Sequence, residues 1–287
     1  MRDLALAVLL CFVGCAGDAP PPPPPRPLSL LLAPDQDALH MGGTGAMTPL
    51  VTLLSEEWTR RSGRPRVLVE ESIGSGGGIR AAVDGAIDLG MVSRPLSSEE
   101  QKLGLVTMKM GQDVVVLVAH PSVEVSSIAT TDLPALYRGE RTKQPSGHPL
   151  LPLLRDRSES ANAALDRVVP GLYEAREQAY KQRRLRVLFS DRAMAEAIAG
   201  TPGSFGITSL SWLIANRLPL KVLGIDGVVP SVENANLHRY RATRELFFVA
   251  RPERLSRAQP FLDFVRTPEA QALMSSYGYI PASEHRP

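Results

Sequence analysis

The chain has 287 residues, of which 44% are hydrophobic and 22% charged, and its formal net charge is +2. A chain of this length can bury a sizeable core or form two lobes. The near balance of charge argues against a nucleic-acid-binding protein, whose footprint is a strongly basic face.

The first 37 residues predict export rather than a folded domain. Arg2 precedes an apolar run over residues 4–13, which is too short to span a bilayer and ends in small residues around Cys15. This pattern predicts a lipoprotein signal peptide over residues 1–14, with Cys15 as the lipid-bearing first residue; an ordinary signal peptide is the alternative. Residues 15–37 contain a proline run that predicts a stiff, solvated tether. We therefore expect an exported, membrane-anchored protein.

Beyond residue 37, helical patterns alternate with strand patterns. An apolar stripe over residues 47–62 stops at Gly63, Ser97 opens a capping box, and Ser190 caps a helix over residues 191–199. Other segments are predicted from length and composition: strands over residues 113–119, 204–208 and 245–250, and two helices or one kinked helix over residues 256–276. This alternation predicts an α/β fold with largely parallel sheets.

The glycine run at residues 74–78 is the most informative segment. Residues 66–70 before it alternate apolar and polar as a strand does, and residues 79–87 after it read as a short helix. Glycines at such a strand-to-helix turn expose backbone amides that bind anions, and Ser75 adds a hydroxyl donor. The alternative is a flexible loop.

Signatures of catalysis are missing from the sequence. It contains no Gly-Lys pair for a Walker-type loop, and Ile73 stands where a nucleophile elbow around Ser75 requires glycine. The five histidines show no metal-ligand spacing. We expect no enzyme activity, no cofactor and no metal site.

Several motifs in chain order together carry a family resemblance. They are residues 42–50 (GGTGAMTPL), 72–79 (SIGSGGGI), 88–96 (DLGMVSRPL), 200–207 (GTPGSFGI) and the ending over 261–281. In this order and spacing the chain resembles the phosphate-binding proteins of ABC importers from about residue 38 to residue 282.

The resemblance implies a type II periplasmic-binding fold, in which two α/β lobes joined by two crossing strands close on a ligand between them. Residues 113–119 and 245–250 would be the crossings. Lobe 1 would comprise residues 38–113 and 247–287, and lobe 2 residues 114–246.

The resemblance also implies ligand-binding residues on both lobes. Ser75 and the following amides would bind oxyanion oxygens, Asp88 would accept the proton of monohydrogen phosphate and so reject sulfate, and Arg155 would supply positive charge. Glu159 is a second carboxylate that must point away, pair with an arginine or weaken binding. The full predicted set is Thr44, Ala46, Met47, Ser75, Gly76, Gly77, Asp88, Ser93, Arg94, Arg155, Ser158 and Ser160.

Two residues of this set differ from the others in their expected role. Ala46 stands where some members of the family carry threonine, so a hydroxyl is missing there, and Arg94 suits a structural ion pair better than a direct contact.

The resemblance implies a periplasmic protein that captures phosphate and delivers it to an ABC-transporter permease. With the lipid anchor predicted at Cys15, we expect a membrane-anchored monomer. A non-transport surface or regulatory protein on the same fold, with altered oxyanion binding, is the alternative. An exported phosphoesterase is a third possibility, supported only by Ser75 and Asp88.

Overall fold

The computed structural model describes residues 38–63, 66–70 and 72–282, all of which belong to one compact unit. The predicted signal peptide, Cys15 and the tether lie outside the described residues. None of the helices in those three ranges has the length and hydrophobicity of a membrane span. The same ranges hold no group of His, Cys, Asp and Glu side chains that could bind a metal ion.

One block of α/β structure is built from both ends of the described chain. Its strands are β1 (Leu39–Gly43), β2 (Val67–Val69), β3 (Leu89–Val92) and β12 (Tyr279–Pro281). Its helices are α2 (Thr48–Ser62), α3 (Gly74–Val83), α4 (Ser98–Gln101), α11 (Leu255–Val265) and α12 (Pro268–Ser276), with a 3₁₀ turn at Pro252–Arg254. Because β1 pairs in parallel with both β2 and β3, the carboxyl ends of these strands meet at one edge.

A second block follows in the middle of the chain. Its strands are β5 (Ser127–Ile128), β6 (Leu151–Pro152), β7 (Leu154–Arg155), β8 (Val187–Leu188), β9 (Ser204–Ser209) and β10 (Lys221–Ile225). Its helices are α5 (Leu133–Arg138), α6 (Ser160–Asp166), α7 (Leu172–Gln182), α8 (Asp191–Ala199), α9 (Leu210–Asn216) and α10 (Val232–Asn236). The two blocks have separate hydrophobic cores, one including Leu54 and Phe261 and the other including Leu165 and Phe205.

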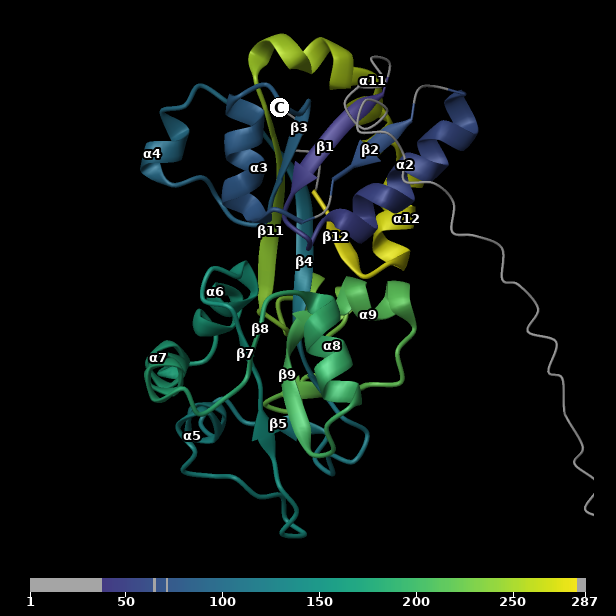
Figure 1. Ribbon diagram of the computed structural model, residues 1–287. Helices are drawn as coiled ribbons and strands as arrows, with labels where there is room; N and C mark the ends of the chain where they lie inside the picture. Colours follow the sequence, from purple (N-terminus) through teal and green to yellow (C-terminus); the bar gives the residue numbers. More distant parts are fainter. Residues whose placement is uncertain (1–37, 64–65, 71, 283–287) are drawn as a thin grey trace, which may run out of the picture. The chain divides into compact units, whose positions relative to one another are not determined.

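Two long strands connect the blocks. β4 (Val106–Ala119) and β11 (Thr243–Ala250) pair antiparallel and lie side by side (Figure 1). The first half of β4 pairs with β11, and its last residues pair with β9 and β10 of the second block. β11 also pairs with β3 of the first block. These are the strands predicted as crossings, although β4 begins seven residues earlier than expected.

The prediction of largely parallel sheets is wrong. Among the described strand pairs, five run parallel and five antiparallel. All the antiparallel pairs involve β4 or β11. β4 and β11 run antiparallel to each other because the chain crosses to the second block along β4 and returns along β11.

Helix α3 begins earlier than predicted, so Ser75, Gly76 and Gly77 lie in its first turn rather than in a turn before it. It packs directly on the sheet beside β1 and β3 (Figure 1). A Cβ atom at Gly78 would lie 2.8 Å from the Gly43 Cα atom, and one at Gly90 would lie 2.7 Å from the Gly78 carbonyl oxygen. Glycine at these positions brings the first turn of α3 close to the end of β3.

Several predicted helix ends are confirmed. α2 ends at Gly63, whose φ of 58° is left-handed, and Ser97 and Glu100 form both hydrogen bonds of the capping box. The Ser190 hydroxyl accepts a hydrogen bond from the Ala193 amide at the start of α8. The C-terminal segment forms two helices, α11 and α12, and Pro260 lies inside the first of them.

Candidate functional site

Four side-chain hydroxyls meet at the carboxyl ends of β1 and β3. The Ser93 Oγ atom lies 2.9 Å from Thr44 Oγ1, 3.2 Å from Ser75 Oγ and 2.7 Å from Ser160 Oγ. The Ser93 amide also donates to Ser75 Oγ at 3.1 Å. We call Thr44, Ser75, Ser93 and Ser160 the hydroxyl cluster; all four belong to the set predicted from the sequence.

The hydroxyl cluster is assembled from both blocks. Thr44 follows β1, Ser75 lies in α3 and Ser93 follows β3, whereas Ser160 is the first residue of α6. Ligands of open α/β sheets bind outside the carboxyl ends of the strands, which is where this cluster lies. Each hydroxyl can both donate and accept a hydrogen bond, so the cluster suits an oxyanion with or without a proton.

Arg244, which the sequence analysis missed, joins this cluster from β11. Its Nη1 atom donates to Ser160 Oγ at 3.2 Å, and its Nε atom donates to Asp113 Oδ2 at 2.9 Å. The Ser209 hydroxyl accepts from Nη2, and Ser211 donates to Asp113 Oδ1 at 2.9 Å. Arg244 is only 2% exposed, so its positive charge acts with little screening by water.

For both Asp113 and Arg244, burial and the neighbouring charge shift the pKa in opposite directions. Burial raises the pKa of the Asp113 carboxyl, with the neighbouring Arg244 guanidinium opposing the shift. Burial acts to lower the pKa of Arg244, but the Asp113 and Asp191 carboxylates outweigh it and the pKa of the guanidinium is raised. Arg244 is therefore a permanent cation at the site.

Arg155 is the second buried guanidinium, and carboxylates surround it. It is 1% exposed; its Nη2 atom donates to Glu159 Oε2 at 2.7 Å, and its Nη1 atom lies 3.7 Å from Asp191 Oδ1. Its Nε and Nη1 atoms have no hydrogen-bond partner among the described residues. Of the possibilities expected for Glu159, the structure has the ion pair with Arg155.

Asp88 does not lie at the hydroxyl cluster, which corrects the predicted contact with a ligand proton. It stands at the amino end of β3, so about 16 Å of strand separates it from Ser93. Its carboxylate accepts from the His40 amide at 2.9 Å and lies 3.4 Å from Arg254 Nη1 and 3.6 Å from Arg257 Nε. The structure gives Asp88 a role in holding α11 and the adjoining 3₁₀ turn to the sheet.

Two further predicted donors are occupied within the protein. The Met47 amide donates to the Thr44 carbonyl at 3.2 Å, and the Ser158 amide and hydroxyl both donate to Asp156 Oδ1, at 3.0 and 2.6 Å. These contacts correct the expectation that Met47 and Ser158 are free to bind an anion.

The other predicted residues lie near the hydroxyl cluster in different ways. The Ala46 amide is 3.4 Å from Thr44 Oγ1, and Gly76 and Gly77 follow Ser75 in the first turn of α3. Arg94, next to Ser93, forms a double contact with Glu100 at 2.6 and 2.7 Å, the ion pair expected from the sequence.

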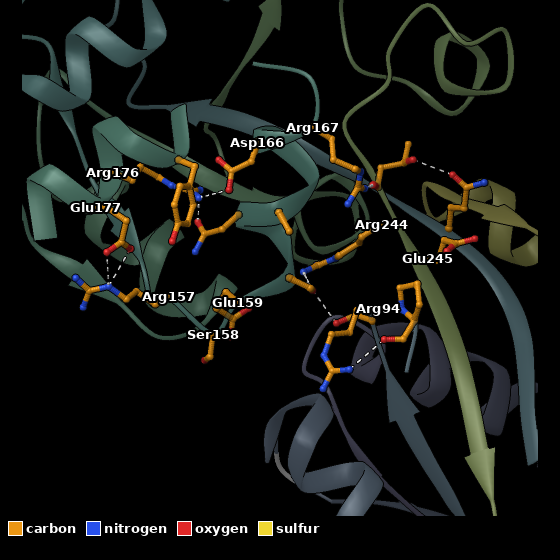
Figure 2. Close-up of a pocket in the computed structure, with 18 of the residues that line it drawn as sticks. Arg94, Arg157, Ser158, Glu159, Asp166, Arg167, Arg176, Glu177, Arg244 and Glu245 are labelled. Atoms are coloured by element: carbon orange, nitrogen blue, oxygen red, sulfur yellow. Dashed lines mark hydrogen bonds and ion pairs between the residues drawn. The ribbon is translucent and has the colours of Figure 1, made fainter. Parts of the chain in front are cut away.

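Two cavities adjoin these residues. The larger, of about 630 Å³, is lined by Ser93, Ser160 and Arg244 and extends past Arg94 and Glu159 to Arg176 and Glu177 (Figure 2). The second, of about 490 Å³, is lined by Ala46, Arg155, Asp191 and Trp212. Glu159 lines both cavities.

Residues 32–269 match the family model of the PBP superfamily domain. The chain belongs to the PBP superfamily. As a PBP superfamily member it has the fold class predicted from the sequence, with two blocks joined by crossing strands and a candidate site assembled from both.

Curated relatives are similar to this PBP superfamily member over most of its length. The phosphate-binding protein PstS of Borreliella burgdorferi is 20% identical over 254 residues, covering 86% of this chain and 90% of the relative. The protein SphX of Synechococcus elongatus is 23% identical over 261 residues, covering 83% of this chain and 76% of the relative. The resemblance read from the motifs is confirmed by these similarities.

Solved structures share the fold. A phosphate ABC transporter substrate-binding protein from Clostridium perfringens, described with bound phosphate, has a TM-score of 0.74 at 20% identity, covering 86% of this chain and all of that one. An ABC-type phosphate transport receptor from Vibrio cholerae has a TM-score of 0.62 at 18% identity, covering 85% of this chain and all of the receptor. At these identities the likeness concerns the fold.

Proposed function

We propose that this chain is an exported solute-binding lipoprotein that captures inorganic phosphate, in its monohydrogen form, for an ABC importer. The observation that carries the proposal is the hydroxyl cluster. Its members come from both blocks, so a tetrahedral anion bound there would be held by both at once, as in proteins that close around a ligand.

The charges around the cluster favour an anion that brings its own proton. Arg244 donates to Ser160 and supplies positive charge, while Asp113, Asp191 and Glu159 lie against the guanidiniums of Arg155 and Arg244. A fully ionised anion would lie near carboxylates to which it has no proton to donate. Monohydrogen phosphate can turn its hydroxyl toward a serine oxygen or a carboxylate, which an anion lacking a proton cannot do.

Similarity to named proteins adds support. The Borreliella relative is named a phosphate-binding protein, and the Clostridium and Vibrio structures are described as phosphate transport components. A binding protein of this kind releases its ligand to a membrane permease, so a permease is the proposed partner and no catalysis is involved.

Thermal unfolding with candidate anions tests the ligand. The purified chain is heated with phosphate, arsenate, sulfate or molybdate. A ligand at one hundred times its dissociation constant stabilises the folded state by about 2.7 kcal/mol, a readily measured shift. We expect phosphate and arsenate to raise the midpoint and sulfate to raise it less. If none of the four raises it, the chain is not an oxyanion-binding protein.

The membrane anchor is tested separately. Cys15→Ser should move the protein from the membrane fraction to the soluble periplasmic fraction, because a lipoprotein is attached through the lipid on its first cysteine. A variant that stays in the membrane fraction, or a mature N-terminus mapped to another residue, would remove the lipoprotein part of the proposal.

The Arg155–Glu159 ion pair favours one alternative, a non-transport surface or regulatory protein with altered oxyanion binding. A carboxylate already bonded to the buried guanidinium competes with any anionic ligand. The same anion series separates the two functions, since the alternative predicts that phosphate does not stabilise the fold.

A further inference from the structure

The larger cavity exceeds what inorganic phosphate needs. An oxyanion of five non-hydrogen atoms takes up about 150 Å³ if each atom occupies the volume of one liquid water. The cavity measures about 630 Å³. By the same measure a sugar phosphate of sixteen such atoms takes up about 480 Å³ and fits.

The cavity and the hydroxyl cluster share a wall. Ser93, Ser160 and Arg244 line the cavity, and the same residues make the hydrogen bonds that define the cluster and its cationic neighbour. A phosphate group held by these three residues therefore lies at the cavity wall. A substituent on one of its oxygens would extend into the open volume (Figure 2).

The opposite wall has polar groups without partners. Arg176 is buried; its Nη1 atom donates to Asn162 Oδ1 at 2.7 Å, and its Nη2 atom donates to Asp166 Oδ2. Arg176 Nε and Asp166 Oδ1 are also buried but have no hydrogen-bond partner among the described residues. Arg176 and Asp166 line the cavity, and once their side chains turn toward it this unpaired donor and acceptor would match ligand hydroxyls, which both accept and donate.

The rest of the lining combines polar groups with apolar surface, as a hydroxylated carbon skeleton does. Most of the lining residues are charged or polar, Pro95 and Ala163 are aliphatic, and the carbon stems of the long side chains add apolar surface. Tyr173, at 57% exposure, offers an aromatic face at the rim, and Tyr180 lies under the Arg157 guanidinium at 4.1 Å. The Tyr173 face would supply contact area for a ring while the charged groups bond its hydroxyls, whereas one face of Tyr180 is already covered by Arg157.

We infer that the solute is a phosphate monoester of a polyol or sugar, with its phosphate on the hydroxyl cluster and its hydroxyls against Arg176 and Asp166. This inference rests on the proposed function, because it uses the same phosphate position, and it makes a monoester rather than inorganic phosphate the preferred solute. The ester would bind as its monoanion, which keeps one phosphate proton.

Calorimetric titration of the purified, ligand-free chain tests the inference. The probes are inorganic phosphate, glycerol 3-phosphate, glucose 6-phosphate and unphosphorylated glucose. We expect at least one ester to bind tenfold or more tightly than inorganic phosphate, and glucose not to bind. If phosphate binds and neither ester reaches that margin, the inference is overturned while the proposed phosphate binding stands. If an ester binds and phosphate does not, the inference stands and the proposed ligand is replaced. If neither phosphate nor ester binds, both fail.

Paired variants locate the ester. Tyr173→Ala should weaken ester binding about five- to tenfold and leave phosphate binding within a factor of two. We expect the same of Asp166→Asn, whose folding is first checked by thermal unfolding. Phe189→Ala is the matched control, because Phe189 is 70% exposed and lines the other cavity. Loss of ester binding in Phe189→Ala with none in Tyr173→Ala would place the ester elsewhere and overturn the inference.

Discussion

The hydroxyl oxygens of Ser93 and Ser160 lie 2.7 Å apart, although 67 residues separate them in the chain. Ser93 belongs to the block that carries β1 and β3, and Ser160 begins a helix of the other block. At a hydrogen-bonding distance, no ligand atom fits between the two oxygens. A phosphate oxygen can bond both residues only after this contact opens, so ligand binding exchanges a serine–serine hydrogen bond for two serine–phosphate bonds.

Ser93→Ala should weaken phosphate binding about ten- to one-hundredfold. Ser93 is the residue that contacts all three other members of the hydroxyl cluster, and hydrogen bonds to a charged group contribute about 1.5–3 kcal/mol. Titration calorimetry measures the change. Ser275→Ala serves as control, since its hydroxyl bonds only the Gln271 carbonyl within α12. Equal affinity in Ser93→Ala and wild type would mean that phosphate does not bind at this cluster.

Glu159→Gln should tighten phosphate binding about fivefold. The substitution removes the carboxylate that occupies the Arg155 guanidinium, and partly exposed ion pairs are worth about 1 kcal/mol. Competition titration against wild type gives the ratio. Glu196→Gln removes a carboxylate from an exposed pair with Arg192 and should change nothing. Weaker binding in Glu159→Gln would identify Glu159 as an acceptor for the ligand proton.

Asp88→Asn should leave the ratio of phosphate to sulfate affinity unchanged while lowering the free energy of unfolding by about 1–3 kcal/mol. The carboxylate is buried, lies far along β3 from the cluster, and holds Arg254 and Arg257. Urea unfolding and paired titrations with the two anions measure both quantities. If Asp88→Asn brings the phosphate and sulfate affinities closer together, Asp88 contacts the ligand and our placement of it is wrong.

Gly78→Ala should destabilise the fold by about 1–3 kcal/mol and weaken phosphate binding with it. The new methyl group would press on Gly43 and on the Met91 carbonyl, moving the first turn of α3, and with it Ser75, away from Ser93. Gly76→Ala is the matched variant in the same turn, where a Cβ atom meets nothing within 4 Å. Similar losses of stability in both variants would contradict the packing argument.

Glu100→Gln should lower stability by less than about 1 kcal/mol at neutral pH, since Arg94 is partly exposed and water screens the pair. Glutamine keeps the capping box, so the variant isolates the ion pair. Hydrogen bonding to Arg94 lowers the pKa of Glu100 from 4.5 to about 2 in the folded state. Between pH 2 and pH 4.5, Glu100 is protonated more in the unfolded chain than in the folded one. The ion pair's contribution to the free energy of unfolding is therefore complete above pH 4.5 and vanishes as pH falls toward 2.

Urea unfolding at pH 7, 4 and 3 follows this change. The free-energy difference between wild type and Glu100→Gln should shrink steadily on acidification. If the free-energy difference stays constant from pH 7 to pH 3, it arises from altered packing of the short helix α4 and not from the ion pair.

The hydroxyls of the candidate site were predicted from the family resemblance, and Ser75 also from its glycine run between a strand and a helix. Thr44 and Ser93 follow strands and Ser160 opens a helix, so each of the motifs that carry them ends an element. The motif over residues 88–96 misled for Asp88, because residues five apart in an extended strand stand at opposite ends of it. A sequence motif gives the spacing of residues along the chain, but it does not say which of them lie at the end of the strand that faces the site.

Arg244 was beyond such rules for a different reason. Its partner Asp113 is 131 residues away, and the two meet only because β4 and β11 pair antiparallel. An arginine ahead of an apolar run looks like the solvated end of a strand, and we expected the strand to begin at residue 245, so that Arg244 fell outside it. Pairing between distant strands decides whether such a charge is buried.

The position of β11 has a consequence for biosynthesis. In the sheet it stands between β3 and β4, yet it is made more than 120 residues after either of them. Until it emerges, β3 lacks one of its two neighbours and Asp113 has no guanidinium to face. The chain must therefore remain without its finished sheet, and without a ligand site, until nearly all of it has been synthesised. Pairing over such distances makes for slow folding, which would leave time for the proposed export before the sheet is complete.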